Sequence, residues 1–212
     1  GVFFGANLGV STLNNSGTVQ GSKDGVFAFM GVNLNNEADG VINGDTDGDG
    51  NGLAFRGGQL EDHQAVDENG NPIWDENGNP VYDIPAEANF TDTVVNAGTM
   101  NGGVDLGLGD DSLTNSGSIN GEVNVGFGTN TVVNSGSVFA SIARDDDPSV
   151  SNGSGVIVGA GSLDLTNQAG GSIVGAKFGV EVRGGVDAAG NQINTADLVI
   201  NNDGLIEGGD DG

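Results

Sequence analysis

The chain has 212 residues, 41 of them glycine and none cysteine, and its 30 acidic against 5 basic side chains give a formal net charge of −25. So negative a chain repels nucleic-acid backbones and anionic membrane surfaces but attracts divalent cations. The lack of cysteine excludes disulfides, thiol nucleophiles and thiolate metal ligands, and no apolar run is long enough to span a bilayer.

The composition also bears on location. A chain without cysteine that is poor in lysine and rich in glycine, asparagine and serine is typical of proteins outside the bacterial cell. We therefore expect an extracellular protein at the bacterial cell surface, with no nucleic-acid partner and no membrane insertion in this segment.

In chain order, one phrase recurs: an apolar residue, any residue, Asn, a short turn with Gly, and a β-branched or apolar residue. Its copies span residues 13–19, 34–42, 94–100, 113–119, 132–138, 165–173 and 200–206. The successive asparagines lie 21, 60, 19, 19, 33 and 35 residues apart, so the longer offsets are one or two repeats plus an insertion. The repeated asparagines are Asn15, Asn36, Asn96, Asn115, Asn134, Asn167 and Asn202.

A fixed period near twenty residues indicates a solenoid. Apolar and polar residues alternate within each copy, which predicts strands, and no window has the spacing of an amphipathic helix. Leucine-rich repeats need many more leucines in each unit. We therefore predict an all-β fold, a single-stranded parallel β-helix with about 19–21 residues per coil. Residues 1–212 would form one β-helix domain, with insertions at 43–90, 142–154 and 186–197.

The phrase also predicts the local structure of each coil. The apolar residues point inward, and the glycine, as in Ser116-Gly117, takes a positive φ at a corner. The asparagine amide reaches the equivalent asparagine of the next coil, about 4.8 Å away, and forms a structural ladder. The alternative is that the aligned asparagines bind a ligand.

The first insertion contains a candidate calcium site. Asp45, Asp47, Asp49 and Asn51 place oxygen ligands at alternate positions around Gly50. The pattern resembles the first half of an EF-hand-type or dockerin-type calcium loop. Its twelfth position is Arg56 instead of glutamate, so Glu61 or Asp62 would have to complete the shell. A solvated acidic loop is the alternative.

The same insertion holds a tandem duplication, DENGNPIW (67–74) and DENGNPVY (75–82). Each ENGNP segment favours a tight turn, because Asn and Gly accept positive φ, and a projecting hairpin is expected. Trp74 and Tyr82 would form an exposed binding surface or would fold back over the side of the helix. The lone histidine, His63, is interpreted as a surface residue.

The other two insertions carry less information. Residues 142–154 contain the charged run Arg144–Pro148, and residues 186–197 are expected to form a turn-centred hairpin. Separately, Gly107–Leu113 and Gly126–Val132 resemble the core of an RTX calcium-binding nonapeptide. Glycine corners without calcium are the alternative there.

Nothing in the sequence favours catalysis, so we expect no enzyme. The five basic residues are too few for a lyase acting on acidic polysaccharides. The alternative is a glycoside hydrolase that uses the carboxylates of Asp105, Asp110 and Asp111.

The pattern GxGxxxLTNSGSIxG in Gly107–Gly121, repeated in Gly126–Val138, resembles the passenger regions of bacterial autotransporters and related large repeat adhesins. The resemblance implies a right-handed β-helix, export through the outer membrane, and adhesion or surface coating. The chain starts and stops inside the repeat, so we expect a piece of a longer protein or a subunit that self-associates end to end. The expected partners are further copies, surface carbohydrate or another cell, with calcium as the possible cofactor.

Overall fold

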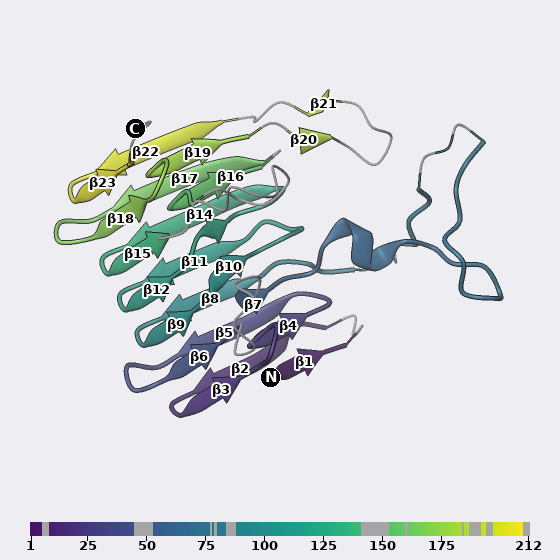
Figure 1. The fold of residues 1–212 in the computed structure, drawn as a ribbon, viewed down its shortest axis with the longest axis horizontal. Helices are drawn as coiled ribbons and strands as arrows, with labels where there is room; N and C mark the ends of the chain where they lie inside the picture. The colour runs from purple at the N-terminus through teal and green to yellow at the C-terminus, as the bar shows by residue number, and fades with distance from the viewer. Residues whose placement is uncertain are drawn as a thin grey trace.

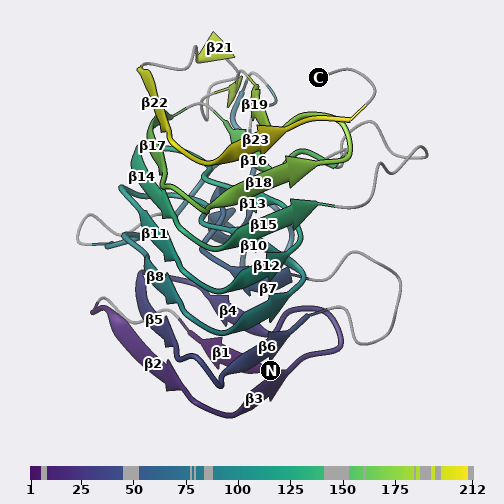
Figure 2. The same ribbon diagram turned by 90° about the vertical axis from the view of Figure 1, so that its left-hand side faces the viewer.

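The computed structural model describes residues 1–5, 9–44, 53–76, 78, 80–83, 88–140, 153–159, 161–183, 185–186, 192–193 and 197–209. The chain winds into a parallel β-helix whose three sheets each contain seven strands (Figures 1 and 2). The predicted fold class is therefore confirmed. A turn of 3-10 helix, Leu60–His63, is its only helical segment among the described residues, and none of their helices is long and apolar enough to cross a membrane.

Each coil contributes one strand to each sheet. Sheet A contains β1 (Val2–Phe4), β4 (Val26–Ala28), β7 (Leu53–Arg56), β10 (Gly103–Asp105), β13 (Val123–Asn124), β16 (Val156–Val158) and β19 (Val180–Val182). Sheet B contains β2 (Ser11–Asn15), β5 (Val32–Asn36), β8 (Thr93–Asn96), β11 (Ser112–Asn115), β14 (Thr129–Asn134), β17 (Ser162–Asn167) and β22 (Leu198–Asn202). Sheet C contains β3 (Thr18–Gln20), β6 (Val41–Asn43), β9 (Thr99–Asn101), β12 (Ser118–Asn120), β15 (Ser137–Ala140), β18 (Ser172–Gly175) and β23 (Leu205–Glu207).

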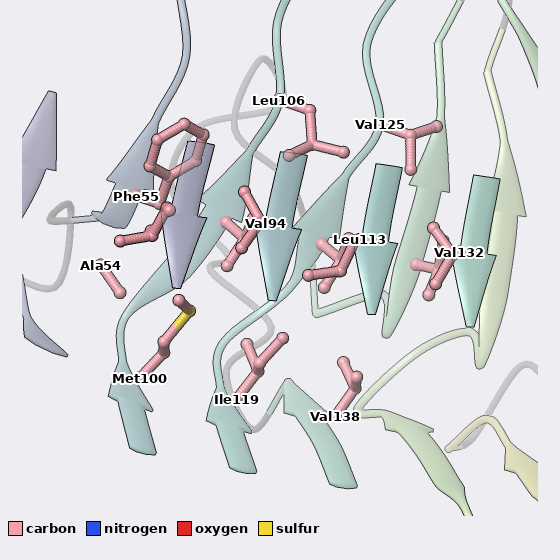
Figure 3. Close-up of a cluster of buried hydrophobic side chains, with 14 of the residues drawn as sticks. Ala54, Phe55, Val94, Met100, Leu106, Leu113, Ile119, Val125, Val132 and Val138 are labelled. Atoms are coloured by element: carbon pink, nitrogen blue, oxygen red, sulfur yellow. The ribbon is translucent and has the colours of Figure 1, made fainter. Parts of the chain in front are cut away.

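The core is a set of apolar columns that run along the helix axis. In sheet B, Leu113 pairs in register with Val94 before it and Val132 after it, and all three are buried. Figure 3 shows these side chains beside the matching column of Met100, Ile119 and Val138 in sheet C. Because every coil repeats the same inward positions, stacking alone builds a continuous core.

Two glycines of the repeated phrase, Gly117 and Gly136, have a different role from the predicted one. Gly117 does not have the positive φ that we expected at this corner. A Cβ on Gly117 would lie 2.1 Å from the Gly98 carbonyl oxygen of the preceding coil, and one on Gly136 would lie 2.1 Å from the Gly117 carbonyl oxygen. Glycine is therefore required because the main chains of successive coils approach closely, and not because of its left-handed freedom.

The first predicted insertion, 43–90, is not one insertion. Its residues Leu53–Arg56 form β7, which pairs with β4 and β10 inside sheet A and buries Ala54 and Phe55. The long excursion lies between β7 and β8. Asn36 stacks directly on Asn96, so even the offset of 60 residues is one coil with its excursions. The sequence missed β7 because the repeated phrase marks the corner between sheets B and C and leaves the strands of sheet A unmarked.

The other two insertions are described only in part. In the third, β20 (Gly185–Val186) pairs antiparallel with β21 (Gln192–Ile193), in agreement with a hairpin. Most of the second insertion, including Arg144–Pro148, lies outside the described residues.

Candidate functional site

The seven repeated asparagines form one column at the corner between sheets B and C. The Nδ2 of each donates a 2.8 Å hydrogen bond to the Oδ1 of the next, from Asn15 through to Asn202. The six from Asn15 to Asn167 are buried. Their amides are used inside the fold, so a ligand cannot reach the column along its length.

A second polar column, which the sequence did not suggest, lies at the start of the sheet B strands. Asp92 Oδ1 accepts the Val32 main-chain N–H at 2.7 Å, and Asp111 Oδ1 accepts the Asp92 N–H at 2.7 Å. One coil later, Asn130 Oδ1 accepts the Asp111 N–H at 3.0 Å, while its Nδ2 donates to the Phe127 carbonyl at 2.9 Å. The sequence shows Asp111 and Asn130 at the same position of the repeated GxGxD pattern. No feature of the sequence indicated that these two side chains are buried.

Asp92 and Asp111 therefore occupy the same position of the coil as the amide of Asn130. Asp92 is 0% exposed and Asp111 is 2% exposed, and the Oδ2 of each has no hydrogen-bond partner. Burial raises the pKa of Asp92 to about 9, helped by the charge of Asp111. Burial likewise raises the pKa of Asp111 to about 8, helped by the charges of Asp110 and Asp105. Burial thus favours the neutral form of both groups at pH 7, and in that form each resembles Asn130 in shape and carries a proton that it can donate.

The three carboxylates of the hydrolase alternative have separate structural roles. Asp105 Oδ1 accepts bonds from the Gly107 N–H and from Asn124 Nδ2, and burial raises the pKa of Asp105 to about 6. Asp110 Oδ1 accepts the Thr129 N–H at 2.7 Å. Because Asp111 is buried, a substrate cannot reach it, and the set would have to act through Asp105 and Asp110 alone.

The RTX-like segments form glycine corners. Gly107, Gly109, Gly126 and Gly128 all have positive φ. A Cβ on Gly126 would lie 2.0 Å from the Gly107 carbonyl oxygen, and one on Gly128 would lie 1.8 Å from the Gly109 carbonyl oxygen. Backbone geometry and close stacking therefore explain these glycines without a metal.

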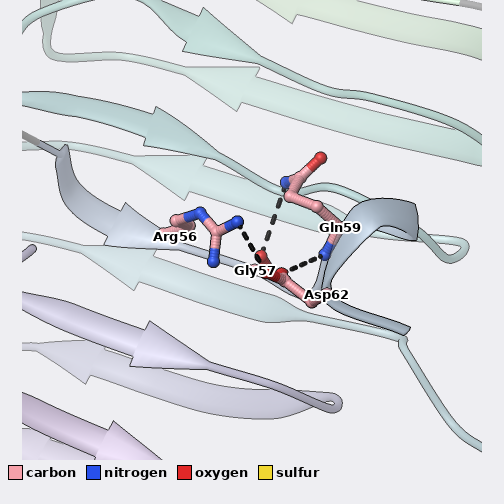
Figure 4. A network of polar contacts seen from close by, with 4 residues as sticks. All are labelled: Arg56, Gly57, Gln59 and Asp62. Carbon is pink, nitrogen blue, oxygen red and sulfur yellow. Dashed lines mark hydrogen bonds and ion pairs between the residues drawn. The ribbon is translucent and has the colours of Figure 1, made fainter. Parts of the chain in front are cut away.

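The calcium ligands predicted in the first insertion, Asp45, Asp47, Asp49 and Asn51, lie outside the described residues, and the site stays a prediction. Asp62, proposed to complete the shell, is occupied by protein groups (Figure 4). Its Oδ1 accepts the Arg56 guanidinium at 2.9 Å, and its Oδ2 accepts the Gln59 N–H at 2.9 Å. Across the described residues, no group of three or more His, Asp or Glu side chains is arranged to hold a metal ion.

The excursion is fastened to the β-helix by His63, and here the sequence interpretation was wrong. His63 is 4% exposed, and its ring packs between Phe29 (4.5 Å between ring centroids) and Phe90 (4.9 Å). Burial lowers the pKa of His63, against the raising effects of Asp62 and of a hydrogen bond with the Phe29 main chain. The error arose because the two phenylalanines come from distant segments of the chain.

Beyond His63 the chain forms a small three-armed unit, residues 63–83, which we call the trefoil. Its central residues bond in a cycle: the Ile73 N–H to the Ala65 carbonyl, the Val81 N–H to the Ile73 carbonyl, and the Ala65 N–H to the Val81 carbonyl, at 2.8–3.0 Å. Antiparallel bridges Val66–Pro72, Trp74–Pro80 and Gln64–Tyr82 close the three arms. The duplication thus has a third, degenerate copy, Ala65-Val66-Asp67, which the sequence analysis missed.

Both turns of the duplication form as predicted. Gly70 and Gly78 each have a φ of 82°, and their N–H groups bond to the Asp67 and Asp75 carbonyls. The Asp67 carboxylate also accepts bonds from the Asn69 and Asn71 main chains. These bonds, with that of the Asn71 side chain, lower the pKa of Asp67. The first turn of the trefoil is therefore held by an aspartate that is negatively charged at neutral pH.

One side of the trefoil carries its tryptophan and its tyrosine. Bridged residues point the same way, and side chains alternate along each arm. The register therefore places Val66, Trp74 and Tyr82 on the side opposite to the central Ala65, Ile73 and Val81. Trp74 is 58% exposed and Val66 is 56% exposed, while Tyr82 is half-buried. Figure 1 shows the excursion extending away from the coils, and the exposure of Trp74 is that of a side chain facing solvent.

No protein-family model matches the chain, and comparisons with curated proteins and with solved structures give no match either.

Proposed function

We propose that this chain is an extracellular structural and adhesive protein of the bacterial cell surface, in which the β-helix is a stiff stalk and the trefoil is the binding element. The observation that carries the proposal is the exposed apolar side of the trefoil. The trefoil extends away from a β-helix whose interior is filled by columns of buried side chains. Large exposed aromatic side chains on a rigid backbone commonly mark interaction sites.

The rod supports the structural half of the proposal. Three in-register sheets, a buried asparagine column and stacked glycines leave each coil one way to pack on the next. Stability in such a stack grows with nearest-neighbour contacts along the axis. A stiff, elongated body of this kind suits presentation of a small binding unit at a distance.

The chemistry of the trefoil side favours a neutral carbohydrate. The exposed Trp74 indole offers a flat apolar surface with an N–H donor, and the Tyr82 hydroxyl adds a second polar group. Sugar rings carry apolar C–H faces between hydroxyl groups, which match this combination. The net charge of −25 and the acidic rim at Asp67 oppose acidic polysaccharides.

Pull-down on insoluble polysaccharides tests the proposal. We expect the chain to bind neutral polysaccharides such as cellulose or chitin and to ignore polygalacturonate. Trp74→Ala should weaken binding about thirtyfold, the effect of losing a central aromatic anchor. The central cycle of main-chain bonds is untouched, so the fold should persist, as circular dichroism would show.

The matched control is Phe139→Ala, which removes another exposed aromatic ring, 49% exposed on sheet C, outside the trefoil. It should leave binding unchanged. Equal losses from both variants, or no binding of the wild-type chain to any neutral polysaccharide, would contradict a carbohydrate-binding trefoil.

A further inference from the structure

We propose, on the basis of the proposed function, that Val66 limits the length of the carbohydrate that the trefoil binds. The trefoil has three equivalent positions on one side, and two of them carry an aromatic ring, Trp74 and Tyr82. Val66 occupies the third position. The ligand is then a pair of adjoining sugar residues in a neutral polysaccharide, which lies over the arms of Trp74 and Tyr82 and not over the arm of Val66.

The main chain of the trefoil repeats from arm to arm. Each residue of the central cycle is followed by one variable residue and then by aspartate, in Ala65-Val66-Asp67, Ile73-Trp74-Asp75 and Val81-Tyr82-Asp83. Because the central residues bond to one another in a closed cycle, the residues that follow them have equivalent places around it. The three variable positions therefore differ in their side chains and not in their main-chain surroundings.

The bridges follow the same rule. Each variable residue pairs with the residue that precedes the next central residue, in the bridges Val66–Pro72, Trp74–Pro80 and Tyr82–Gln64. The Asp67 N–H donates to the Asn71 carbonyl at 2.9 Å, and the Asp83 N–H donates to the His63 carbonyl at 2.8 Å. His63 therefore has the same place in the third arm as Asn71 in the first, and the equivalence extends to the joint with the β-helix.

Val66 is small although its position is open. Its side chain lies on the same side of the trefoil as those of Trp74 and Tyr82, because side chains alternate along each arm and bridged residues point the same way. Val66 is 56% exposed, and Trp74, at the equivalent position, is 58% exposed. A ring would therefore have as much space at Val66 as at Trp74, and packing does not explain the valine.

The side chains of the three positions offer a sugar different surfaces. An aromatic ring has a flat apolar face, which covers the C–H face of one sugar ring. Valine branches at Cβ and is held in few rotamers, so it has no flat face to offer. The rings of Trp74 and Tyr82 on neighbouring arms thus serve two adjoining sugar residues, and the arm of Val66 gives a third sugar no ring to stack on.

The polarity of the three bridges adds to this limit. Val66 is bridged to Pro72, and neither side chain has a polar atom. Tyr82 is bridged to Gln64, and together they carry a hydroxyl and an amide. A sugar over the arm of Val66 would give up water from its hydroxyl groups without gaining a hydrogen-bond partner, which is unfavourable. The arm of Val66 therefore disfavours a further sugar, and the arm of Tyr82 accommodates one.

The test is calorimetric titration of the chain with neutral oligosaccharides of cellulose or chitin of increasing length. For the wild type, we expect the affinity to rise strongly from the monosaccharide to the disaccharide and to level off at the trisaccharide. An affinity that rises as steeply again at the trisaccharide would overturn the proposal, because the site would then extend beyond Trp74 and Tyr82.

Val66→Tyr supplies a ring at the third position and should make the trisaccharide bind about tenfold more tightly than the disaccharide. The matched control is Ile73→Tyr, which adds the same ring at a 38% exposed position on the opposite side of the trefoil. Its length dependence should remain that of the wild type. Equal responses of the two variants, or no response of a Val66→Tyr chain with wild-type circular dichroism, would overturn the role of Val66.

Val66→Ala removes the side chain without adding a new surface. It should keep the affinity for the disaccharide within about twofold of the wild type, because this ligand lies over the other two arms, while Trp74→Ala loses about thirtyfold. A loss in Val66→Ala as large as in Trp74→Ala would overturn the proposal.

The same titrations separate the two levels of the account. A wild-type chain that binds no neutral oligosaccharide overturns the proposed function and the limit at Val66 together. A wild-type chain that binds, with a length dependence that Val66→Tyr does not change, overturns only the role of Val66.

Discussion

The stalk and the trefoil use opposite means to hold their shape. In the stalk, identical positions stack every coil, and buried side chains supply the contacts. In the trefoil, a cycle of main-chain bonds supplies the order, and large side chains such as Trp74 remain exposed. In the proposed function, the β-helix provides mechanical stability and the trefoil provides recognition. The repeat of about twenty residues builds a rod with few free groups on its inside, and the eight-residue duplication builds a small unit whose side chains are available to a partner.

The largest expected effect concerns the buried acids of the stalk. The folded-state pKa values of Asp92 and Asp111 are raised, to about 9 and about 8. In the folded chain, these two acids therefore keep protons that they release in the unfolded chain once the pH rises above the ordinary aspartate pKa of 3.8. Each acid should lower the free energy of unfolding by about 1.4 kcal/mol per pH unit across that window. We expect stability to fall steeply between about pH 5 and pH 8.

Denaturant unfolding at several pH values checks this expectation. The double variant Asp92→Asn, Asp111→Asn should flatten the profile and gain several kcal/mol at pH 8, because the amides keep the shape and supply the missing proton. The exposed Asp110→Asn is the control. A wild-type stability that does not change from pH 5 to pH 8 would show that these acids are not neutral in the fold.

The next effect separates two rows of asparagine. Asn115→Ala removes a buried link and leaves groups of Asn96 and Asn134 without partners, which should cost about 2–3 kcal/mol of unfolding free energy. Asn120 makes a similar 2.7 Å side-chain bond to Asn101 on the outside of sheet C, and Asn120→Ala should cost less than about 1 kcal/mol. Similar costs in thermal unfolding would count against burial as the source of the column's strength.

A third comparison separates inner and end coils. Gly117→Ala places a methyl group 2.1 Å from the Gly98 carbonyl oxygen and should destabilise the fold by about 1–3 kcal/mol. Gly17→Ala occupies the same position of the first coil, where the space is free. The Gly17→Ala variant should therefore unfold at the same denaturant concentration as the wild-type chain. If both variants unfold alike, close stacking is not what selects glycine in the inner coils.

The smallest effect on the stalk comes from the joint between the regions. His63→Ala removes the ring between Phe29 and Phe90, so hydrogen exchange of the Ala65, Ile73 and Val81 amides should accelerate while the coils stay protected. Lowering the pH should also accelerate the hydrogen exchange of these amides. Because burial lowers the pKa of His63, its contribution is present above the ordinary value of 6.5 and is lost as the pH falls. Unchanged exchange in the variant would show that the trefoil needs no such anchor.

The sequence predicted the features that every coil repeats. The β-helix and its coil length follow from the spacing of Asn96, Asn115 and Asn134, because a repeating contact leaves a repeating pattern. It did not reveal β7, whose sheet lies away from the marked corner, or the burial of His63, which depends on contacts between distant segments. The sequence did not reveal the column of Asp92 and Asp111 for a related reason. An aspartate that precedes a strand can be solvated and charged or buried and protonated, and the sequence does not distinguish the two.

Trp74 is the only tryptophan of the chain, so its fluorescence reports directly on the proposed binding surface. Titration with soluble neutral oligosaccharides, such as those of cellulose or chitin, tests the central claim that the trefoil is the binding element. We predict a saturable blue shift of the emission, as the exposed indole leaves water, and no shift with oligogalacturonate. An emission that does not change with any neutral oligosaccharide, while the chain still binds the polysaccharide, would place the binding surface elsewhere on the stalk.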